Sequence, residues 1–221
     1  MDCAFYNPIY KKGHSIFDLR ISVRGSKSNI IKKIKLNLIG PHNILNSVSA
    51  IAVCLHIGIN VKVIKNSLKK FSGIQRRLTK VFKIDQKEFF DDYAHHPTEI
   101  KVVLEGVNKV YNGFEKVCIF QPHRISRLKD LRKEFSFAFK NADTVILCPI
   151  FSAGEKIRLG FNYLNFAKEI IKNSKVKLFL VKDSNQLANF IKKNMYGKKI
   201  VIGMGAGSIS NWMRELPNLI Q

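Results

Sequence analysis

Hydrophobic and polar positions follow two successive periodic patterns in the first third of this 221-residue chain. Apolar and polar residues first alternate one by one, which is typical of half-buried strands, and apolar residues then recur every three or four positions, as in amphipathic helices. The pattern predicts strands over 15–24 and 30–38 around a turn at 25–29, then helices between Gly40 and Gly58 and over 61–70. A single hairpin is not stable alone, so we expect it to form the edge of a larger body.

From Leu78 onward, short apolar strands alternate with amphipathic helices. This alternation predicts an α/β fold whose mostly parallel sheet is covered by helices on both faces. Between the two parts, Gly73 and the polar residues around it indicate a hinge, where we place the domain boundary. The expected strands are 78–84, 87–90, 116–120, 144–148, 176–181 and 199–202, and the expected helices are 98–111, 126–140, 163–172, 184–194 and one from about 208.

The charge of the chain raises the question of an anionic partner. The formal net charge is +22, with 38 Lys and Arg against 16 Asp and Glu, which could indicate nucleic acid or an anionic membrane surface. The lysines are dispersed along every element, however, whereas a nucleic-acid groove would concentrate arginine and exposed aromatic residues in one region. We therefore expect no specific nucleic-acid partner, and we expect the basic surface to attract phosphorylated small molecules.

The sequence gives no sign of a membrane or a secretory location. The chain start lacks the pattern of a signal peptide, and no apolar segment is long enough to cross a bilayer, so a cytoplasmic location is expected. The four cysteines are widely spaced, which favours reduced, unligated thiols over disulfides or a zinc site. They are Cys3, Cys54, Cys118 and Cys148.

The stretch Asp91-Asp92-Tyr93-Ala94-His95-His96-Pro97-Thr98-Glu99 is the first candidate for chemistry. It joins an expected strand to an expected helix, and Pro97 suits the first helical position. Such strand-to-helix turns lie outside the carboxyl ends of parallel strands, where ligands bind and helix N-termini attract anions. Two structural alternatives stay open: Asp92 could only support the turn, and His95 could pair locally with Glu99.

A second cluster, Gln121-Pro122-His123-Arg124-Ile125-Ser126-Arg127, follows another expected strand. Arg124 and Arg127 are three apart at the start of an expected helix, and two guanidinium groups there suit a carboxylate or a phosphate. They could instead pair with Asp130, Glu134 or other surface acids. We expect the two strands to be adjacent in one sheet, so that a shared pocket explains both clusters better.

Two further loops follow expected strands, at 151–155 and 203–208. The glycines of the second loop do not have the spacing of a dinucleotide-binding fingerprint, so a nicotinamide cofactor is not expected. Their simplest interpretation is close backbone packing at the rim of the pocket.

Taken together, these stretches resemble the Mur ligases, the ATP-dependent amide-forming enzymes of peptidoglycan precursor synthesis. The resemblance is strongest to the branch that joins L-alanine to UDP-N-acetylmuramate. It implies that residues 1–72 are the C-terminal remnant of the central ATP-binding domain and that 73–221 form the Rossmann-like C-terminal domain. The matching stretches occur in family order and are Gly40–Asn46, Gly73–Arg77, Asp91–Glu99, Gln121–Arg127, Ser152–Glu155 and Gly205–Ile209.

The resemblance also implies roles for individual residues. Asn43 and Asn46 resemble the pair that meets the adenine of ATP. Arg77 and Asp92 resemble ligase residues near the nucleotide phosphates and the hinge, and with His95 they would be catalytic. The residues that resemble the alanine-side pocket are Tyr93, His95, His123, Arg124 and Arg127. In the implied reaction, Mg-ATP phosphorylates the muramate carboxyl group, and the alanine amine then attacks the acyl phosphate.

The sequence departs from the family in one large respect. It contains no Gly-x-x-Gly-Lys-Thr phosphate loop, no metal-binding acid of the central domain and no N-terminal domain for the uridine nucleotide. We therefore expect a chain that is inactive alone, with no metal ligands of its own and with the main Mg²⁺ ligands in a separately supplied N-terminal portion. The alternatives are a fragment of the murein-peptide-recycling ligase and a non-catalytic module that binds nucleotide or amino acid.

Overall fold

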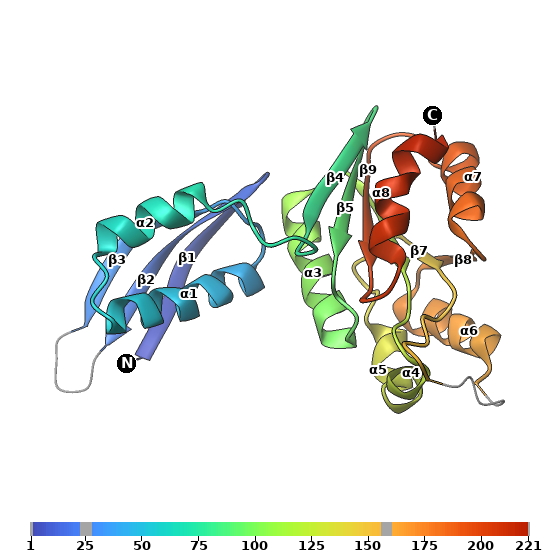
Figure 1. Ribbon diagram of the computed structural model, residues 1–221, viewed down its shortest axis with the longest axis horizontal. Coiled ribbons are helices and arrows are strands. Elements are labelled where there is room, and N and C mark those ends of the chain that lie inside the picture. The colour runs from blue at the N-terminus through green and yellow to red at the C-terminus, as the bar shows by residue number, and fades with distance from the viewer. Residues whose placement is uncertain (1, 23–27, 156–160, 221) are drawn as a thin grey trace. The chain divides into compact units, whose positions relative to one another are not determined.

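The computed structural model describes residues 2–22, 28–155 and 161–220, so most of the turn expected at 25–29 lies outside the described residues. The chain forms two compact units (Figure 1). The first comprises Met1–Gly73 with Glu105–Tyr111, and the second comprises Ile74–Leu104 with Asn112–Gln221. No helix among the described residues is long and apolar enough to cross a membrane.

The first unit is a three-stranded antiparallel sheet with two helices packed on one face (Figure 1). The alternation predicted for the central strand is confirmed, because Phe17, Leu19 and Ile21 are buried and pack against Ile44 and Ile64 of the two helices. The elements are β1 Asp2–Lys11, β2 His14–Ser22, β3 Asn29–Leu36, α1 Pro41–His56 and α2 Val61–Lys70, with the strands in the order β1-β2-β3.

Only two of these three strands are predicted from the sequence. Strand β1 pairs with β2, but its register shifts between Tyr6 and Ile9. Such an irregularity breaks the one-by-one alternation on which strand prediction depends. The first unit is therefore a sheet with its own small core and not a lone hairpin.

The second unit confirms the predicted α/β fold. Its six strands lie in the order β4-β5-β9-β6-β7-β8, and all neighbours are parallel except β4 and β5. The strands are β4 Thr79–Ile84, β5 Lys87–Asp92, β6 Glu115–Phe120, β7 Thr144–Leu147, β8 Lys177–Leu180 and β9 Lys199–Met204. The helices are α3 Pro97–Val110, of which residues 105–110 are grouped with the first unit, α4 Ile125–Asp130, α5 Arg132–Phe137, α6 Tyr163–Ser174, α7 Ser184–Asn194 and α8 Ile209–Ile220.

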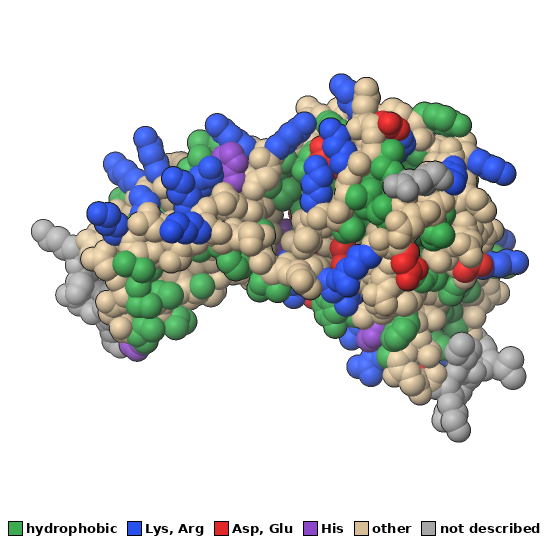
Figure 2. Space-filling model, turned by 45° about the horizontal axis from the view of Figure 1, so that its top comes forward, with side chains coloured by type: hydrophobic (Ala, Val, Ile, Leu, Met, Phe, Trp, Pro, Cys, Tyr) green, Lys and Arg blue, Asp and Glu red, His purple; other side chains and the backbone are tan. Residues whose placement is uncertain are grey.

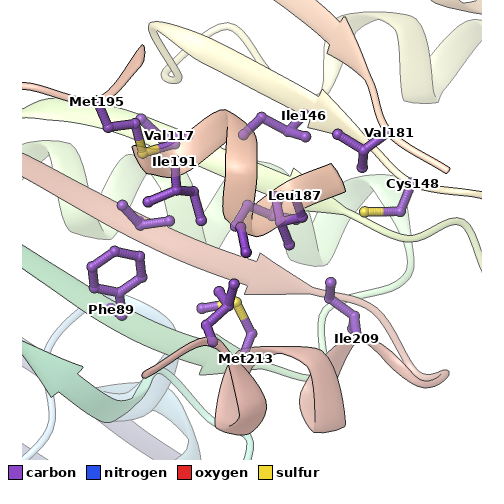
Figure 3. Close-up of a cluster of buried hydrophobic side chains, with 14 residues drawn as sticks. Phe89, Val117, Ile146, Cys148, Val181, Leu187, Ile191, Met195, Ile209 and Met213 are labelled. Carbon is purple, nitrogen blue, oxygen red and sulfur yellow. The ribbon is translucent and has the colours of Figure 1, made fainter. Parts of the chain in front are cut away.

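Consecutive residues of β6 show that both faces of the sheet are covered. Ile119 belongs to a buried cluster with Leu187 of α7 and Met213 of α8, which Figure 3 shows in detail. The next side chain, Phe120, points to the opposite face, where its ring lies 5.6 Å from that of Phe135 in α5. Both faces are therefore apolar, as expected for parallel strands buried between helices.

Several predicted elements differ from the structure in their bounds, and two of the differences affect the surroundings of the site. The single helix expected over 126–140 is two short helices, α4 and α5, which meet at Leu131 with φ −111° and ψ 26°. Neither glycine nor proline marks this break in the sequence. The strand expected to end at Phe90 continues through Asp91 and Asp92, which pair with Gly203 and Met204 of β9.

Candidate active site

The candidate site lies at the carboxyl edge of the second sheet. Asp92 of β5 and Phe120 of β6 are both paired with Met204 of β9, and Phe120 is also paired with Leu147 of β7. Four parallel strands therefore end at one level, and the loops that follow them leave the sheet together. This is the edge at which ligands bind in open α/β sheets.

The expectation that β5 and β6 are adjacent is wrong. Strand β9 lies between them, because the chain returns from β8 to the centre of the sheet before it ends. All six residues of β9 are buried, as suits a central strand. The loop that follows β9 therefore enters the site between the two predicted clusters.

The predicted clusters nevertheless converge. The rings of His95 and His123 have centroids 5.8 Å apart. Tyr93 meets His95 edge to face at 5.1 Å, and Phe151 stacks on His123 at 5.6 Å with an interplanar angle of 12°. Four aromatic rings from the loops after β5, β6 and β7 thus form a continuous row, which we call the ring row.

The local pair between His95 and Glu99 is present as well. The Nδ1 atom of His95 lies 2.9 Å from the carbonyl oxygen of Tyr93 and 3.6 Å from Oε2 of Glu99. The same carboxylate oxygen accepts hydrogen bonds from the backbone N–H groups of His95 and His96, at 3.0 and 3.2 Å. Burial raises the pKa of Glu99, but these N–H groups and the electrostatic effects of His95 and Arg77 outweigh it, so the pKa is lowered overall. An ionised Glu99 therefore fixes the corner that carries the imidazole.

Arg124 is positioned by a strained backbone. It precedes α4 with φ 55° and ψ 147°, a conformation that is costly for a residue with a side chain. Its N–H group donates to the carbonyl oxygen of Phe151 at 3.0 Å, and Nη1 lies 3.8 Å from Oε1 of Glu155. The side chain is 49% exposed, so about half of its surface is accessible from solvent.

Arg127 and His123 contact each other directly. The Nη1 atom of Arg127 donates to the carbonyl oxygen of His123 at 3.3 Å and lies 3.4 Å from its Nδ1 atom. The pKa of His123 is lowered by burial and by the nearby His95, Arg127 and Arg124, against a smaller opposing effect of Glu155. A neutral imidazole beside guanidinium groups can accept a proton while the guanidinium groups hold an anion.

Asp92 has both carboxylate oxygens engaged by the backbone. They accept hydrogen bonds from the N–H groups of Leu78, at 2.7 Å, and Ala94, at 2.8 Å. Burial raises its pKa to about 6, against the lowering effects of these hydrogen bonds and of Arg77. This geometry corresponds to the structural alternative, in which Asp92 supports the turn. Arg77 itself is exposed, and its charge also lowers the pKa of Glu99.

Arg76 was not predicted as a site residue. Its Nη2 atom donates to the carbonyl oxygen of Gly205 at 2.6 Å, and its guanidinium carbon lies 4.6 Å from the centroid of the Tyr93 ring. Its Nε atom is 3.9 Å from Oδ2 of the buried Asp91, which accepts a hydrogen bond from Ser210. Only its place beside Arg77 in Gly73–Arg77 could have suggested this role, because its partners are distant in sequence.

The glycine loop after β9 is packed closely, as predicted. Gly205 has φ 149°, and a Cβ atom there would lie 2.6 Å from the carbonyl oxygen of Gln121. A Cβ atom on Gly207 would lie 2.5 Å from Oε1 of Gln121 and 2.6 Å from Cγ of Phe151. Gln121 also binds the start of α8, since Oε1 accepts from the N–H group of Ile209 at 3.0 Å. The loop therefore packs directly against Gln121 and against Phe151, one member of the ring row.

The residues expected to contact ATP belong to the first unit. Asn43 is buried, and its Nδ2 atom donates to the carbonyl oxygen of Ile39 at 2.9 Å, whereas Asn46 is exposed on α1. Within the described ranges, no group of three or more His, Cys, Asp or Glu side chains could hold a metal ion. The described residues therefore do not fit a Mg²⁺ site, and of the two asparagines Asn46 is the exposed one.

The chain matches a known protein family and several proteins that belong to it. A family model described as Mur ligase, glutamate ligase domain, matches residues 76–207. A UDP-N-acetylmuramate–L-alanine ligase from Pelagibacter ubique is 62% identical over 210 residues, which cover 95% of this chain and 45% of that protein. The corresponding ligase from Rickettsia bellii is 39% identical, over 92% of this chain and 43% of that protein.

Solved structures show the same fold. The UDP-N-acetylmuramate-alanine ligase of Thermotoga maritima matches 98% of this chain and 45% of its own chain, with a TM-score of 0.75 and 22% sequence identity. A murein peptide ligase from Psychrobacter arcticus matches with a TM-score of 0.66 and 20% identity. The chain thus spans less than half the length of the relatives that it matches. From the family match and these identities, the chain belongs to the Mur ligase family.

Proposed function

We propose that this chain is the amino-acid-binding part of an ATP-dependent ligase that adds L-alanine to UDP-N-acetylmuramate in peptidoglycan precursor synthesis. The single observation that carries the proposal is the convergence of His95, His123 and Arg124 from loops whose strands are not neighbours. The 62% identity to a ligase of that name supports the choice of substrates. Residues 1–72 would then belong to the central domain and 73–221 to the C-terminal domain.

The guanidinium groups of Arg124 and Arg127 would bind the carboxylate of L-alanine. Arg124 is half exposed at the strained corner, and Arg127 lies against His123, so both can reach one small anion beside the ring row. Bidentate pairing of guanidinium with carboxylate gives both affinity and orientation. The amine of the bound alanine would then face His95 and His123, with Tyr93 at the end of the row.

The imidazoles would take part in removing a proton from the alanine ammonium group. A free amine is needed to attack an activated carboxyl carbon, and a neutral His123 is suited to accept the proton. ATP bound with Mg²⁺ would supply the phosphoryl group that activates the muramate carboxyl. This chain would contribute orientation of the amine and charge neutralisation, which account for much of the rate in such reactions.

Arg77, Asp92, Asn43 and Asn46 have supporting roles in this proposal. Arg77 is exposed near Asp92 and Glu99, where it could meet a phosphate, while Asp92 holds the corner in place. Asn46 would contact the adenine, and Asn43 would anchor the start of α1 through its bond to Ile39. The chain alone would not catalyse the ligase reaction, because its described residues offer no Mg²⁺ site.

Reconstitution tests this proposal. The chain is mixed with a separately produced amino-terminal portion of the Pelagibacter ubique relative, and ADP release is measured with UDP-N-acetylmuramate, ATP and L-alanine. We expect release only from the mixture and only with L-alanine. Release that requires a murein peptide instead would assign the chain to the recycling ligases. If the folded partners bind L-alanine but release no ADP, the result would support the alternative of a non-catalytic binding module.

A further inference from the structure

A cavity opens at the carboxyl edge of the six-stranded sheet, beside the last two strands, β7 and β8. Its volume is about 460 Å³, which is within the range of small-molecule pockets. Its lining comes from the end of β8, from the segments that follow β7 and β8, and from the starts of α6 and α7. None of the lining residues belongs to the candidate active site, so this space, which we call the β7–β8 cavity, needs its own explanation.

The walls of the β7–β8 cavity are apolar. Ile150 follows β7, and Leu180 and Val181 lie at the end of β8. Tyr163 contributes its ring, because its hydroxyl group already donates a hydrogen bond to the carbonyl oxygen of Cys148. Leu180 is 41% exposed although it is a large apolar residue. The cavity therefore leaves apolar surface in contact with water, and an apolar ligand would gain free energy by covering it.

Two polar side chains complete the lining, and together they suit a carboxylate. Lys182 is exposed, and its ammonium group forms no ion pair with a carboxylate of the described residues. The backbone N–H group of Lys182 donates to Oε1 of Gln186 at 2.6 Å, which fixes the orientation of that amide and leaves its NH₂ group as a donor. The neighbouring Asp183 is engaged elsewhere, since it caps α7 by accepting from the N–H group of Gln186 at 2.8 Å. An ammonium group and an amide NH₂ group are thus available to one anionic head.

The overall charge of the chain does not by itself select such a ligand. Figure 2 shows Lys and Arg side chains spread over both units, with hydrophobic side chains between them. Any small anion is therefore attracted to this surface. A ligand that carries both a carboxylate and an apolar body, in contrast, matches both parts of the β7–β8 cavity.

We propose that the β7–β8 cavity is a binding site for an apolar monocarboxylic acid. Its carboxylate would meet Lys182 and Gln186, and its hydrocarbon part would lie against Ile150, Leu180 and the ring of Tyr163. An amine of the same shape is repelled by the ammonium group of Lys182, so the sign of the charge distinguishes the ligand class. This inference goes beyond the proposed function and does not depend on it.

A ligand in the β7–β8 cavity would also touch the segment that carries one member of the ring row. Pro149 and Ile150 line the cavity and directly precede Phe151. The N–H group of Phe151 donates to the carbonyl oxygen of Pro122 at 2.9 Å, and its ring stacks on the imidazole of His123. Because Ile150 and Phe151 are consecutive residues, occupation of the cavity should change the surroundings of His123 as well.

Titration of the chain with octanoate tests the site, at concentrations below those at which octanoate forms micelles. The methyl resonances of Ile150 and Val181 are followed by NMR, and we expect them to shift together and to saturate. Octylammonium, which has the same hydrocarbon chain and the opposite charge, should not saturate them at equal concentration. Lys182→Ala should raise the half-saturation concentration about three- to fivefold, a modest effect because the ammonium group is exposed. Lys168→Ala, at an exposed position of α6 outside the cavity, should change it by less than about twofold.

A matched pair of substitutions on β8 tests the apolar wall. Leu180 and Phe179 are both 41% exposed, but consecutive strand residues point to opposite faces of a sheet. Phe179 does not line the cavity, and its ring lies 4.7 Å from that of Phe190 in α7. Leu180→Glu places a negative charge in the wall and should raise the half-saturation concentration at least about tenfold, whereas Phe179→Glu should change it by less than about twofold. Circular dichroism checks that both variants fold.

Three results would overturn this inference. They are the absence of a saturable shift when octanoate is added to the folded wild type, an equal response to octylammonium, and equal effects within either pair of substitutions. Constant resonances of His123 at saturating octanoate would contradict the link to the ring row. The outcome is separable from that of the proposed function, because the titration uses this chain alone and requires neither ATP nor L-alanine.

Discussion

The imidazole rings of His95 and His123 lie 5.8 Å apart although the strands that precede them, β5 and β6, are separated by β9. The loops after β5 and β6 therefore reach over the end of the central strand. The glycines at 205 and 207 make this approach possible, because side chains there would collide with Gln121 and Phe151. The candidate site is thus built by residues of three loops, and the middle loop approaches the other two closely because it carries these glycines.

Removal of a guanidinium group is expected to weaken alanine binding specifically. In the reconstituted ligase, Arg124→Ala should raise the KM for L-alanine by about 10- to 100-fold, the range for a lost hydrogen bond to a charged group. The KM for ATP should stay nearly constant. Lys129→Ala, which removes an exposed cation on α4, the helix that follows Arg124, is the control and should change neither value. An increase confined to the KM for ATP would mean that Arg124 binds phosphate instead.

Asp92 should make stability depend on pH in an unusual direction. Burial raises its pKa from 3.8 to about 6, so between these pH values the folded state binds more protons than the unfolded state, and stability falls as pH rises. Ionisation of Asp92 should lower the free energy of unfolding by about 3 kcal/mol in total. Asp92→Asn does not titrate and loses one of two backbone hydrogen bonds, so it should be less stable than wild type at pH 4.

The difference in unfolding free energy between wild type and Asp92→Asn should shrink by about 2–3 kcal/mol from pH 4 to pH 7. Urea unfolding at several pH values measures it. Asp130→Asn, at an exposed position, controls for the general effect of removing an acid. A difference that grows with pH would show that Asp92 is stabilised as a carboxylate by its hydrogen bonds.

Replacement of Arg76 by lysine should destabilise the folded chain. One guanidinium group binds the carbonyl oxygen of Gly205, covers the ring of Tyr93 and faces the carboxylate of Asp91, which a single ammonium group cannot do at once. Arg76→Lys should lower the free energy of unfolding by about 1–3 kcal/mol. Arg77→Lys, at the exposed neighbouring position, should change it by less than about 0.5 kcal/mol. Equal losses in urea titrations would contradict the role given to Arg76.

Phe151 should control the protonation of His123. Its ring stacks on the imidazole and contributes to the burial that lowers the His123 pKa, together with His95, Arg127 and Arg124 and against Glu155. In Phe151→Ala, the pKa should rise toward its ordinary value, as followed by NMR of the imidazole from pH 5 to pH 8. Phe179→Ala on β8 serves as the control. An unchanged or lower pKa would exclude this role for Phe151.

The sequence was sufficient to predict elements whose signals are local. Helices α2 and α7 have the predicted bounds, because capping residues and periodic apolar positions define them. The break at Leu131 was missed, since it depends on the packing of α5 against α6, where Phe135 meets Phe166 edge to face. No residue near Leu131 carries a helix-ending signal of its own.

The candidate site was predictable to the extent that its residues occur in clusters. Tyr93, His95, His123, Arg124 and Arg127 lie together as expected, because each cluster follows a strand of the same sheet. The insertion of β9 and the role of Arg76 were not predictable. Both depend on contacts between residues that are distant in sequence, such as that between Arg76 and Gly205, and periodicity does not report such contacts.

The central claim is that loops from two separate strands form one receptor for alanine. NMR of the reconstituted protein, with isotopically labelled histidine in this chain, tests it most directly as L-alanine is added. The account predicts that the resonances of His95 and His123 shift together with one half-saturation point, while those of His14 and His56 in the first unit stay constant. Shifts of only one of the two imidazoles, or of neither at saturating L-alanine, would contradict it.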